Sequence, residues 1–443
     1  MKDLNMKVCL TGDSIVLRRL NTDIDPVCAP LFDMIRDCDA SFTNLEIMPS
    51  DYQGDPALDH GGSHFSAHPW ILDELRTAGF DLFAAATNHC LDYGISGLRI
   101  AIEELKRREI LYSGVGLTLE EARRPAYFSH PAGTVSMLSC CSTFARGQEA
   151  ADQTRSMQGR PGLNPLHFNT TYQVKPEELS VLQKISAGLG LEKIKQEQIK
   201  LGFGYPAPEG TLTLDGTRFV EGSETRITSA PNARDLEEIG RWVREARVVS
   251  DVVIVSVHTH EVGYDADGTI SWEKPGEFLE AFARDAIDQG ADIVVCHGQH
   301  LLKGMEIYKG KPIFYSLGNF IGQNELVDML PEDSYTFYKV STDVTPHQVY
   351  KTRTLNDTKG FPADRRFWET LLPICEFADD GTLSSMEIHP VSLGLGKSAH
   401  TRGLPFLAEG EEGASILSRF EALCEPYGVH FTREKGKLVL KQD

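Results

Sequence analysis

The sequence predicts a layered α/β fold, and three observations support this prediction. Short apolar runs typical of buried strands alternate along the chain with amphipathic helical stretches. The alternation is interrupted near residue 145 and resumes near residue 235. Polar motifs follow at the points where several strand-like runs end. This arrangement is typical of α/β cores, in which helices cover the faces of a sheet.

The first part of the alternation extends from residue 6 to about residue 139. Its strand-like runs are rich in Val, Leu, Ile and Phe, and its helical stretches repeat apolar residues every three or four positions. The expected strands are Met6–Leu10, Ala40–Ile47, Asp81–Ala86, Leu111–Ser113 and Val135–Ser139. The expected helices are Pro30–Ile35, His68–Ala78 and Ile95–Arg108.

The second part of the alternation begins near residue 235. The expected helices are Asp235–Ala246 and Pro275–Gln289, and the expected strands are Asp251–Val257 and Asp292–Cys296. A β-hairpin is expected next, in which Met305–Tyr308 and Ile313–Ser316 are joined by Lys309-Gly310-Lys311. Beyond Asn319 the signals are mixed, with a helix at Gly413–Cys424 and strands at Met386–His389 and Leu438–Lys441.

The region between the two parts has a different composition. Residues 146–233 carry glycine, proline and aromatic residues around one charged helical stretch, Glu177–Gln198. Long segments of this kind are frequently functional. We interpret the region as an insertion over the core that acts as a substrate lid, and residues 326–443 as a mixed α/β C-terminal region.

The composition narrows the class of protein. The 443 residues include 64 Asp and Glu against 44 Lys and Arg, which gives a formal net charge of −20. This charge repels a nucleic-acid backbone and an anionic membrane surface, so we expect neither as a partner. The N-terminal residues form no long apolar segment, and no run of about 18 apolar residues occurs without a charge. We therefore expect a cytoplasmic protein.

The cysteines are expected to be reduced. There are nine of them, an odd number, several lie inside apolar runs, and no CxxC pair is present. They therefore suit buried free thiols better than disulfides or a structural zinc site.

Five polar motifs stand where strand-like runs end. They are Thr11-Gly12-Asp13, Asn44-Leu45-Glu46, Thr87-Asn88-His89, His258-Thr259-His260 and His297-Gly298-Gln299-His300. In an open α/β sheet, the loops that leave neighbouring strands converge at the carboxyl ends of those strands. The motifs together offer two carboxylates, an amide oxygen and five imidazoles. This set predicts a site for two divalent metal ions, with Mn, Fe or Zn favoured over Mg or Ca.

Each motif alone also has a purely structural interpretation. Asp13 would then cap a following helix, and Glu46 would be a solvated strand end. Asn88-His89 would form a turn, and His258 and His260 would be partly buried core residues. The occurrence of all five motifs in one chain favours the metal site.

Six segments that contain these motifs resemble one known family. They are LTGDSIVLRRL, FTNLEI, AGFDLFAAATNHCLDYGISGL, SGVGLTLEEARRP, SVHTHE and GADIVVCHGQHLLKGMEIYKGKPIFYSLGNF. They resemble the CapA-like (poly-gamma-glutamate synthesis) branch of the calcineurin-like metallophosphoesterase superfamily. The similarity covers about residues 6–145 and 235–325, a little over half of the chain.

The resemblance implies a four-layer α/β/β/α sandwich in which shared ligands bridge two metal ions. Residues 1–145 and 234–325 would then be the two halves of the metal-binding domain. The implied metal ligands are Asp13, Glu46, Asn88, His258 and His297. The resemblance also implies that His89 is an acid/base or charge-stabilising partner of Asn88. The other catalytic candidates are His260, His300 and Asp92, with Asp92 orienting His89.

The sequence departs from the superfamily pattern in three places. Glu46 stands where phosphoesterases usually have an aspartate. The first motif lacks the histidine expected two residues after Asp13. The last motif reads His-Gly-Gln-His where many relatives read His-Pro-His, which leaves open whether His297 or His300 is the ligand.

Four further residues are candidates for binding substrate. His64 lies in a histidine-rich loop that either faces the cleft or, as the loop composition favours, lies on the surface. Arg146 and Arg160, with Arg155 between them, have guanidinium groups suited to a carboxylate or phosphate, or are solvated loop charges. Asn319 is the next-to-last residue of the last matching segment and would line or cap the site.

Hydrolysis of a phosphate- or carboxylate-bearing substrate, in which metal ions activate water, is the leading functional hypothesis. The same residues suit metal-dependent epimerisation at a peptide α-carbon, as in CapA-like proteins linked to lasso peptides. A third hypothesis is a non-catalytic accessory protein of polyglutamate or capsule synthesis. We expect a small-molecule or peptide substrate and a homodimer.

Overall fold

The computed structural model describes residues 5–22, 25–60, 62–265, 267–378, 380–398 and 401–441. The chain divides into two compact units. The first comprises 1–166, 234–261 and 283–443, and the second comprises 167–233 and 262–282. The insertion was expected at 146–233, whereas the second unit begins later and also takes in 262–282. The expected C-terminal region, 326–443, falls in the first unit.

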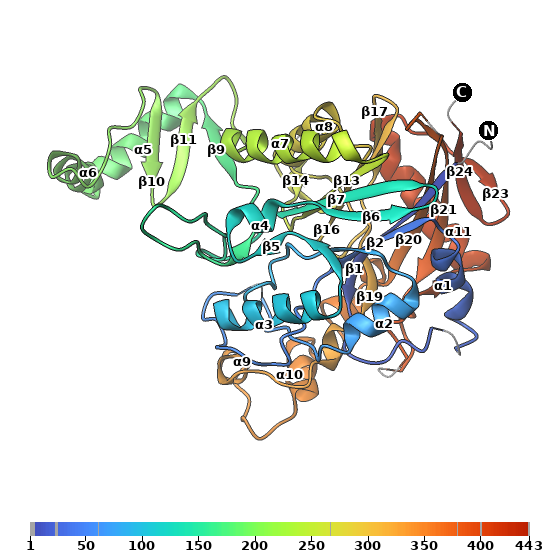
Figure 1. The fold of residues 1–443 in the computed structure, drawn as a ribbon. Coiled ribbons are helices and arrows are strands. Elements are labelled where there is room, and N and C mark those ends of the chain that lie inside the picture. Colours follow the sequence, from blue (N-terminus) through green and yellow to red (C-terminus); the bar gives the residue numbers. More distant parts are fainter. Residues whose placement is uncertain are drawn as a thin grey trace. The chain divides into compact units, whose positions relative to one another are not determined.

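A ten-stranded sheet forms one half of the core of the first unit (Figure 1). Its parallel part contains β1 (Met6–Ile15), β2 (Ala40–Leu45), β3 (Leu82–Ala84) and β4 (Leu111–Ser113). β19 (Asn319–Gly322) also pairs in parallel with β1. The C-terminal strands continue the same sheet beyond β1 and are β20 (Glu369–Phe377), β21 (Leu383–Ser392), β22 (Phe406–Leu407), β23 (Thr432–Glu434) and β24 (Lys437–Lys441).

A six-stranded sheet forms the other half of the core. Its order is β17 (Met305–Tyr308), β18 (Lys311–Phe314), β16 (Ile293–His297), β13 (Val252–His258), β7 (Gly133–Cys141) and β6 (Ala126–His130). The four strands from β18 to β7 run parallel, so their carboxyl ends lie at one edge of the sheet. β17 and β18 form the expected hairpin, with positive φ values at Lys309 and Gly310 in the turn.

The two sheets pack face to face through one apolar cluster. This cluster combines Val8 and Phe42 of the first sheet with Met137 and Ile254 of the second. Helices α1 (Ala29–Arg36), α2 (Ile71–Ala78) and α3 (Gly94–Arg107) lie on the outer face of the first sheet, and α7 (Ala233–Val249) lies beside the second (Figure 1). The predicted four-layer α/β/β/α sandwich is therefore confirmed.

The remaining helices of the first unit are short or lie at the C-terminal side. They are α4 (Leu119–Arg123), α9 (Glu332–Tyr338), α10 (Pro346–Arg353) and α11 (Gly410–Cys424). Ile416, Leu417 and Phe420 of α11 join the cluster between the sheets. The C-terminal residues thus contribute to the core between the two sheets.

The second unit contains its own four-stranded sheet, with strand order β10 (Thr211–Leu214), β11 (Thr217–Glu221), β9 (Phe168–Val174) and β12 (Arg226–Pro231). The single charged helix expected at Glu177–Gln198 is instead two helices, α5 (Pro176–Gly188) and α6 (Leu191–Lys200). Gly190 separates them with a left-handed φ of 75°. The small core of this unit contains Val174, Leu179 and Leu212.

Two further observations bear on the sequence predictions. All nine cysteines are free, as expected. Among the described residues, no helix is long and apolar enough to cross a membrane. The chain also contains one more helix, α8 (Glu277–Asp288), and two short strand pairs. These pairs are β14–β15 (Gly263–Tyr264 and Ile270–Ser271) and β5–β8 (Val115–Gly116 and Gly162–Leu163).

Candidate metal centre

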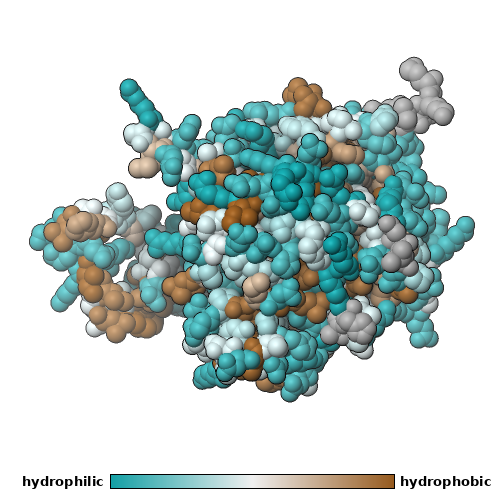
Figure 2. Space-filling model, turned by 60° about the horizontal axis from the view of Figure 1, so that its bottom comes forward, coloured by the Kyte–Doolittle hydropathy of each residue, from teal (hydrophilic) through white to brown (hydrophobic). Residues whose placement is uncertain are grey.

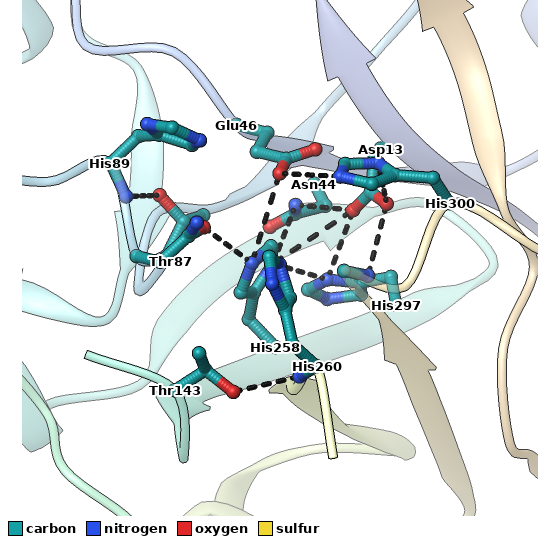
Figure 3. Close-up of polar contacts among 12 residues, drawn as sticks. Asp13, Asn44, Glu46, Thr87, His89, Thr143, His258, His260, His297 and His300 are labelled. Atoms are coloured by element: carbon teal, nitrogen blue, oxygen red, sulfur yellow. Dashed lines mark hydrogen bonds and ion pairs between the residues drawn. The ribbon is translucent and has the colours of Figure 1, made fainter. Parts of the chain in front are cut away.

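Parallel strand ends bring the predicted ligands together (Figure 3). In the first sheet, Asp13 of β1 is in register with Asn44 of β2 and with Asn319 of β19. In the second sheet, His258 of β13 is in register with His297 of β16. All five side chains are buried. The strands therefore place the motifs at one edge of the sandwich, as the strand-end argument predicts.

Two glycines of the motifs allow the backbone to approach Asp13 closely. A Cβ at Gly12 would lie 1.9 Å from the carbonyl oxygen of Gly318, which accepts the Asp13 N–H at 2.9 Å. Gly298 has a φ of 109° and donates its N–H to Asp13 Oδ2 at 2.9 Å. Glycine is the residue that tolerates both the contact and the left-handed backbone.

Asp13 is fully buried, yet its carboxylate faces several donors. Besides Gly298, Asn44 donates to Oδ1 at 2.8 Å, and His297 Nδ1 lies 3.3 Å from the same oxygen. His300 Nδ1 lies 3.5 Å from Oδ2. Burial alone would raise the pKa of Asp13, but the hydrogen bonds of His297 and His300 outweigh it and hold that pKa well below its usual range. Asp13 is therefore ionised and does not cap a helix.

Glu46 has a different environment, although it is also fully buried. Among the residues that the structure describes, none donates a hydrogen bond to either carboxylate oxygen. The nearest imidazole nitrogens are His300 Nε2 at 3.6 Å and His258 Nε2 at 3.8 Å from Oε1. Burial, followed by the charges of Asp13 and Asp92, raises the pKa of Glu46 well above its usual value. The alternative interpretation of Glu46 as a solvated strand end is therefore wrong.

His258 lies between the two carboxylates. Its Nε2 is 2.8 Å from Asn88 Oδ1, and its Nδ1 is 3.1 Å from His297 Nδ1. The other nitrogen of His297, Nε2, is 2.7 Å from Ser256 Oγ, a contact that fixes the orientation of the ring. Burial lowers the pKa of His258 well below its usual value, so the ring is neutral. A neutral imidazole is the form that binds metal.

His300 approaches the same centre from the loop after β16. Its Nδ1 is 2.7 Å from Asn319 Oδ1, and its backbone has a positive φ of 62°. Positive φ is uncommon for a residue other than glycine and is often found at functional sites. Asn319 therefore orients His300, while His300 Nε2 is directed towards Glu46.

His260 lies beside His300, and the centroids of the two rings are 5.6 Å apart. Its Nε2 is buried without a hydrogen-bond partner. Burial, followed by the proximity of His300, lowers the pKa of His260 to about 3. Its backbone N–H donates to Thr143 Oγ1 at 2.7 Å. Thr143 and Thr259 in turn donate to the carboxylate of Glu261 at 2.8 and 2.6 Å, which holds the chain that carries His260.

His89 and Asp92 form a buried pair next to the cluster. His89 Nδ1 lies 2.6 Å from Asp92 Oδ2, which also accepts the backbone N–H of Phe65 at 2.7 Å. The His89 ring packs against the Phe65 ring at 4.5 Å between centroids. Asn88 and His89 do lie in a turn, but the Asn88 amide oxygen also contacts His258 and the His89 ring pairs with Asp92. Such a pair holds the imidazole in one orientation, as in acid/base catalysis.

The donor set fits divalent metal ions. Three overlapping groups of ligand atoms each lie within 4.8 Å of one another, namely Asp13, His258 and His297; Asp13, Glu46 and His300; and Glu46, His258 and His260. The unsatisfied oxygens of Glu46 and the unsatisfied Oδ1 of Asn44 support this fit, because buried polar atoms normally have partners. Imidazole with carboxylate suits Mn, Fe or Zn.

The remaining predicted residues lie elsewhere. His64 is fully buried, so its preferred assignment to a surface loop is wrong, and its Nε2 lies 2.9 Å from the carbonyl oxygen of Ala57. Arg146 and Arg160 are exposed, and Arg160 donates to the carbonyl oxygen of Glu149 at 2.8 Å.

Sequence reasoning missed Asn44, Ser256 and Glu261 as parts of the site. Asn44 and Glu261 lie inside or next to two of the motifs, NLE and HTHE, which was the available signal. Ser256 is a polar residue within an apolar strand and gives no such signal.

Comparisons with known proteins identify the family. The family model described as "Bacterial capsule synthesis protein PGA_cap" matches residues 7–324. The chain belongs to this family, and the predicted CapA-like resemblance is confirmed.

Individual relatives agree with this assignment. "Uncharacterized protein y4sH" of Sinorhizobium fredii is 33% identical over 434 residues, which cover 96% of this chain and 90% of that protein. "Capsule biosynthesis protein CapA" of Bacillus anthracis is 24% identical over 258 residues, 58% of this chain and 44% of that protein. This chain therefore matches less than half of the length of the Bacillus protein.

A solved structure from Staphylococcus aureus, described as a "Putative 5'-Nucleotidase", aligns with 94% of this chain and 58% of that one. It is 11% identical, with a TM-score of 0.37. The fold assignment above does not depend on this distant likeness.

Proposed function

We propose that this protein is a metal-dependent hydrolase that acts on a phosphate- or carboxylate-bearing substrate. The observation that carries the proposal is the buried Glu46 carboxylate, which accepts no hydrogen bond from the described residues although four imidazoles and Asp13 belong to the same overlapping ligand groups. A buried carboxylate without donors is costly unless a cation compensates it. A chain that keeps such a group beside histidines is suited to hold divalent ions there.

The proposed arrangement contains two ions. Asp13, His258 and His297 would hold one, and Asp13, Glu46 and His300 would hold the other, so that Asp13 is shared. Ser256 and Asn319 fix the rings of His297 and His300 by hydrogen bonds. Such outer contacts orient metal-binding histidines in many proteins. This arrangement would use both His297 and His300.

Divalent ions in this position would polarise the scissile group of the substrate and lower the pKa of water to near neutrality. The chain's own residues supply the proton steps. His89, held through Nδ1 by Asp92, has Nε2 available to protonate the leaving group. Water gives up a proton as its oxygen bonds to phosphorus or carbonyl carbon, the bond to the leaving group breaks, and the leaving group takes the His89 proton. The proton released by water then restores His89. Asn88 would orient His258 through its amide oxygen.

The experiment is a substrate screen on metal-loaded protein. Phosphate release from phosphomonoesters and phosphodiesters, and amine release from acylated peptides, are measured for the wild type, His89→Ala and His389→Ala. His389 is a matched control because its side chain is only 14% exposed and it too lies beside a carboxylate, that of Glu387, but in β21. Hydrolysis that His89→Ala lowers by about 10²-fold or more, and His389→Ala leaves unchanged, supports the proposal.

Epimerisation at a peptide α-carbon is a second candidate, and His260 favours it. The unpaired Nε2 of His260 lies beside His300. Together with the ring of His89, it would give the site two imidazole bases. Two bases are what removal and return of a proton on opposite faces of a carbon require. Incorporation of solvent deuterium at an α-carbon without cleavage would favour this reaction over hydrolysis.

The accessory role is the remaining candidate. "Probable polyglutamine synthesis accessory protein Rv0574c" of Mycobacterium tuberculosis is 34% identical over 97 residues, 21% of this chain. A purified protein that neither retains metal nor takes it up would favour this role. The residues of the candidate metal centre would then serve only as a scaffold.

A further inference from the structure

A pocket of about 190 Å³ adjoins the candidate metal centre in the first unit. Phe361 connects the two, because it lines the pocket and its ring centroid lies 5.0 Å from that of His300. The Phe367 ring follows, 4.3 Å from Phe361, and the carbonyl oxygen of Phe367 accepts a hydrogen bond from Asn319 at 3.3 Å. The wall of this pocket is therefore built on residues that contact or position His300.

The wall next to the metal centre is aromatic. Phe361, Phe367 and Trp368 line it, and Trp368 Nε1 donates to the backbone carbonyl oxygen of Phe361 at 2.6 Å, which holds the Trp368 side chain against the Phe361 backbone. Aromatic rings pair favourably in offset or edge-to-face geometry. A cavity of about 150 Å³ is known to admit benzene, so this pocket has room for one ring with a short substituent.

The charged residues of the pocket leave a positive excess. The two acids, Glu325 and Asp357, both form ion pairs with Arg402, and Asp357 also pairs with Lys351. Two cations of the lining, Arg353 and Lys359, have no carboxylate within ion-pair distance among the described residues. Arg353 donates to Ser63 Oγ at 2.7 Å, a neutral partner. This local excess is notable in a chain with a net charge of −20.

Arg353 also marks the boundary with a second pocket of about 240 Å³. Both pockets are lined by Tyr350 and Arg353, and the second is mostly apolar, with Leu330, Phe337 and Val349 in its wall. A guanidinium between two such pockets can meet an anionic group while the rest of the ligand contacts aromatic surface.

We propose that the pocket beside His300 binds an aromatic ring that carries an anionic group. The ring lies against Phe361, Phe367 and Trp368, and the carboxylate or phosphate lies towards Lys359 and Arg353. The assignment of this pocket as a substrate subsite rests on the proposed hydrolase function. It specifies the substrates of that hydrolase as aryl anions. The binding itself requires only the pocket.

Equilibrium binding of simple probes tests this proposal. The aryl anions are 3-phenylpropionate and phenylphosphonate, the anions without a ring are propionate and methylphosphonate, and the ring without charge is 3-phenylpropanol. Each is titrated by calorimetry into the full chain, both metal-free and metal-loaded. The metal-free titrations exclude coordination of the anion to metal as the source of affinity.

We expect both aryl anions to bind metal-free protein at least about 10-fold more tightly than the matched probes lacking ring or charge. Phe361→Ala and Lys359→Gln should each weaken binding about 5- to 10-fold. Phe203→Ala and Lys200→Gln, exposed positions of the second unit, are the matched controls and should change nothing. Preference for 3-phenylpropionate over phenylphosphonate would identify the anion as a carboxylate, and the reverse preference a phosphate.

Equal affinity for probes with and without the ring, or unchanged affinity in both Phe361→Ala and Lys359→Gln, would overturn the proposal. The failures of the two proposals are distinguishable. If metal-loaded protein hydrolyses esters but binds all probes equally, the proposed hydrolase function stands and the proposed binding pocket is wrong. If the protein binds the aryl anions as expected but never retains metal, the proposed binding pocket stands and the proposed hydrolase function is wrong.

Discussion

Asp13 and Glu46 are both fully buried carboxylates at the ends of neighbouring strands, but the fold treats them differently. Asp13 accepts hydrogen bonds from Asn44 and Gly298 and lies next to two imidazoles. Glu46 accepts none. The pKa of Asp13 is accordingly held well below its usual range, and that of Glu46 is raised well above it. The chain therefore compensates one negative charge and leaves the other for a cation to compensate.

The largest expected effect comes from His258, the residue that stands between the two carboxylates. It belongs to two of the three ligand groups, one with each carboxylate. His258→Ala should therefore lower metal-dependent activity by about 10³-fold or more, with the fold retained. Activity is measured with the best substrate of the screen, and circular dichroism checks the fold. Activity within tenfold of wild type would remove His258 from the mechanism.

The two carboxylates should respond in opposite directions when each is neutralised in metal-free protein. Asp13→Asn leaves its donors mismatched and should lower the free energy of unfolding by about 3 kcal/mol. Glu46→Gln removes a buried charge without donors and should raise that free energy by about 1–3 kcal/mol at pH 8. Denaturant unfolding of both variants in the presence of chelator measures the difference. Equal destabilisation would mean that Glu46 has donors of its own.

The layered fold could be predicted because its strands are apolar runs and its helices have amphipathic spacing. β20 escaped prediction because Pro373 interrupts its pattern, although the strand pairs with β1 and β21. β19 has only four residues, and its place beside β1 depends on tertiary packing. The charged stretch 177–198 was expected to be one helix, because its helical spacing of apolar residues continues across Gly190. The left-handed backbone at Gly190 nevertheless ends the helical conformation there.

The ligands of the candidate site were more predictable than the residues that orient them. Asp13, Glu46, Asn88, His258 and His297 end strand-like runs, and parallel pairing is enough to bring such residues to one edge. The orienting residues Ser256 and Asn44 lie within strands, where the sequence does not reveal which face a polar side chain serves. The burial of His64 depends on packing of the loop, which periodicity does not describe.

The orienting residues should matter less than the ligands, and they provide a matched pair. Ser256 orients His297, on the Asp13 side, and Asn319 orients His300, on the Glu46 side. Ser256→Ala and Asn319→Ala should each weaken metal affinity about 10- to 100-fold, because a freed ring samples other orientations. Competition with a metal-binding dye measures the affinity. Ser418→Ala, on the exposed face of α11, is the control and should leave the affinity unchanged.

The smallest effect expected is a pH dependence specific to Glu46. Its pKa in the folded, metal-free protein is raised above the ordinary value of 4.5, so the folded state binds the proton more tightly than the unfolded state. Its contribution to stability is present below about pH 4.5 and is lost as the pH rises towards the pKa of Glu46 in the folded protein. Wild-type metal-free protein should therefore lose stability relative to Glu46→Gln between pH 5 and 8. Parallel curves for the two proteins would contradict this assignment.

We propose that Glu46 binds a cation and that the site holds two ions. The most direct test is the metal content per chain of protein purified without chelator, compared among wild type, Glu46→Gln and Asp13→Ala. We expect about two equivalents of Mn, Fe or Zn in the wild type, about one in Glu46→Gln and close to none in Asp13→Ala. A wild-type protein that holds no metal, even after reconstitution with each of these ions, would contradict it.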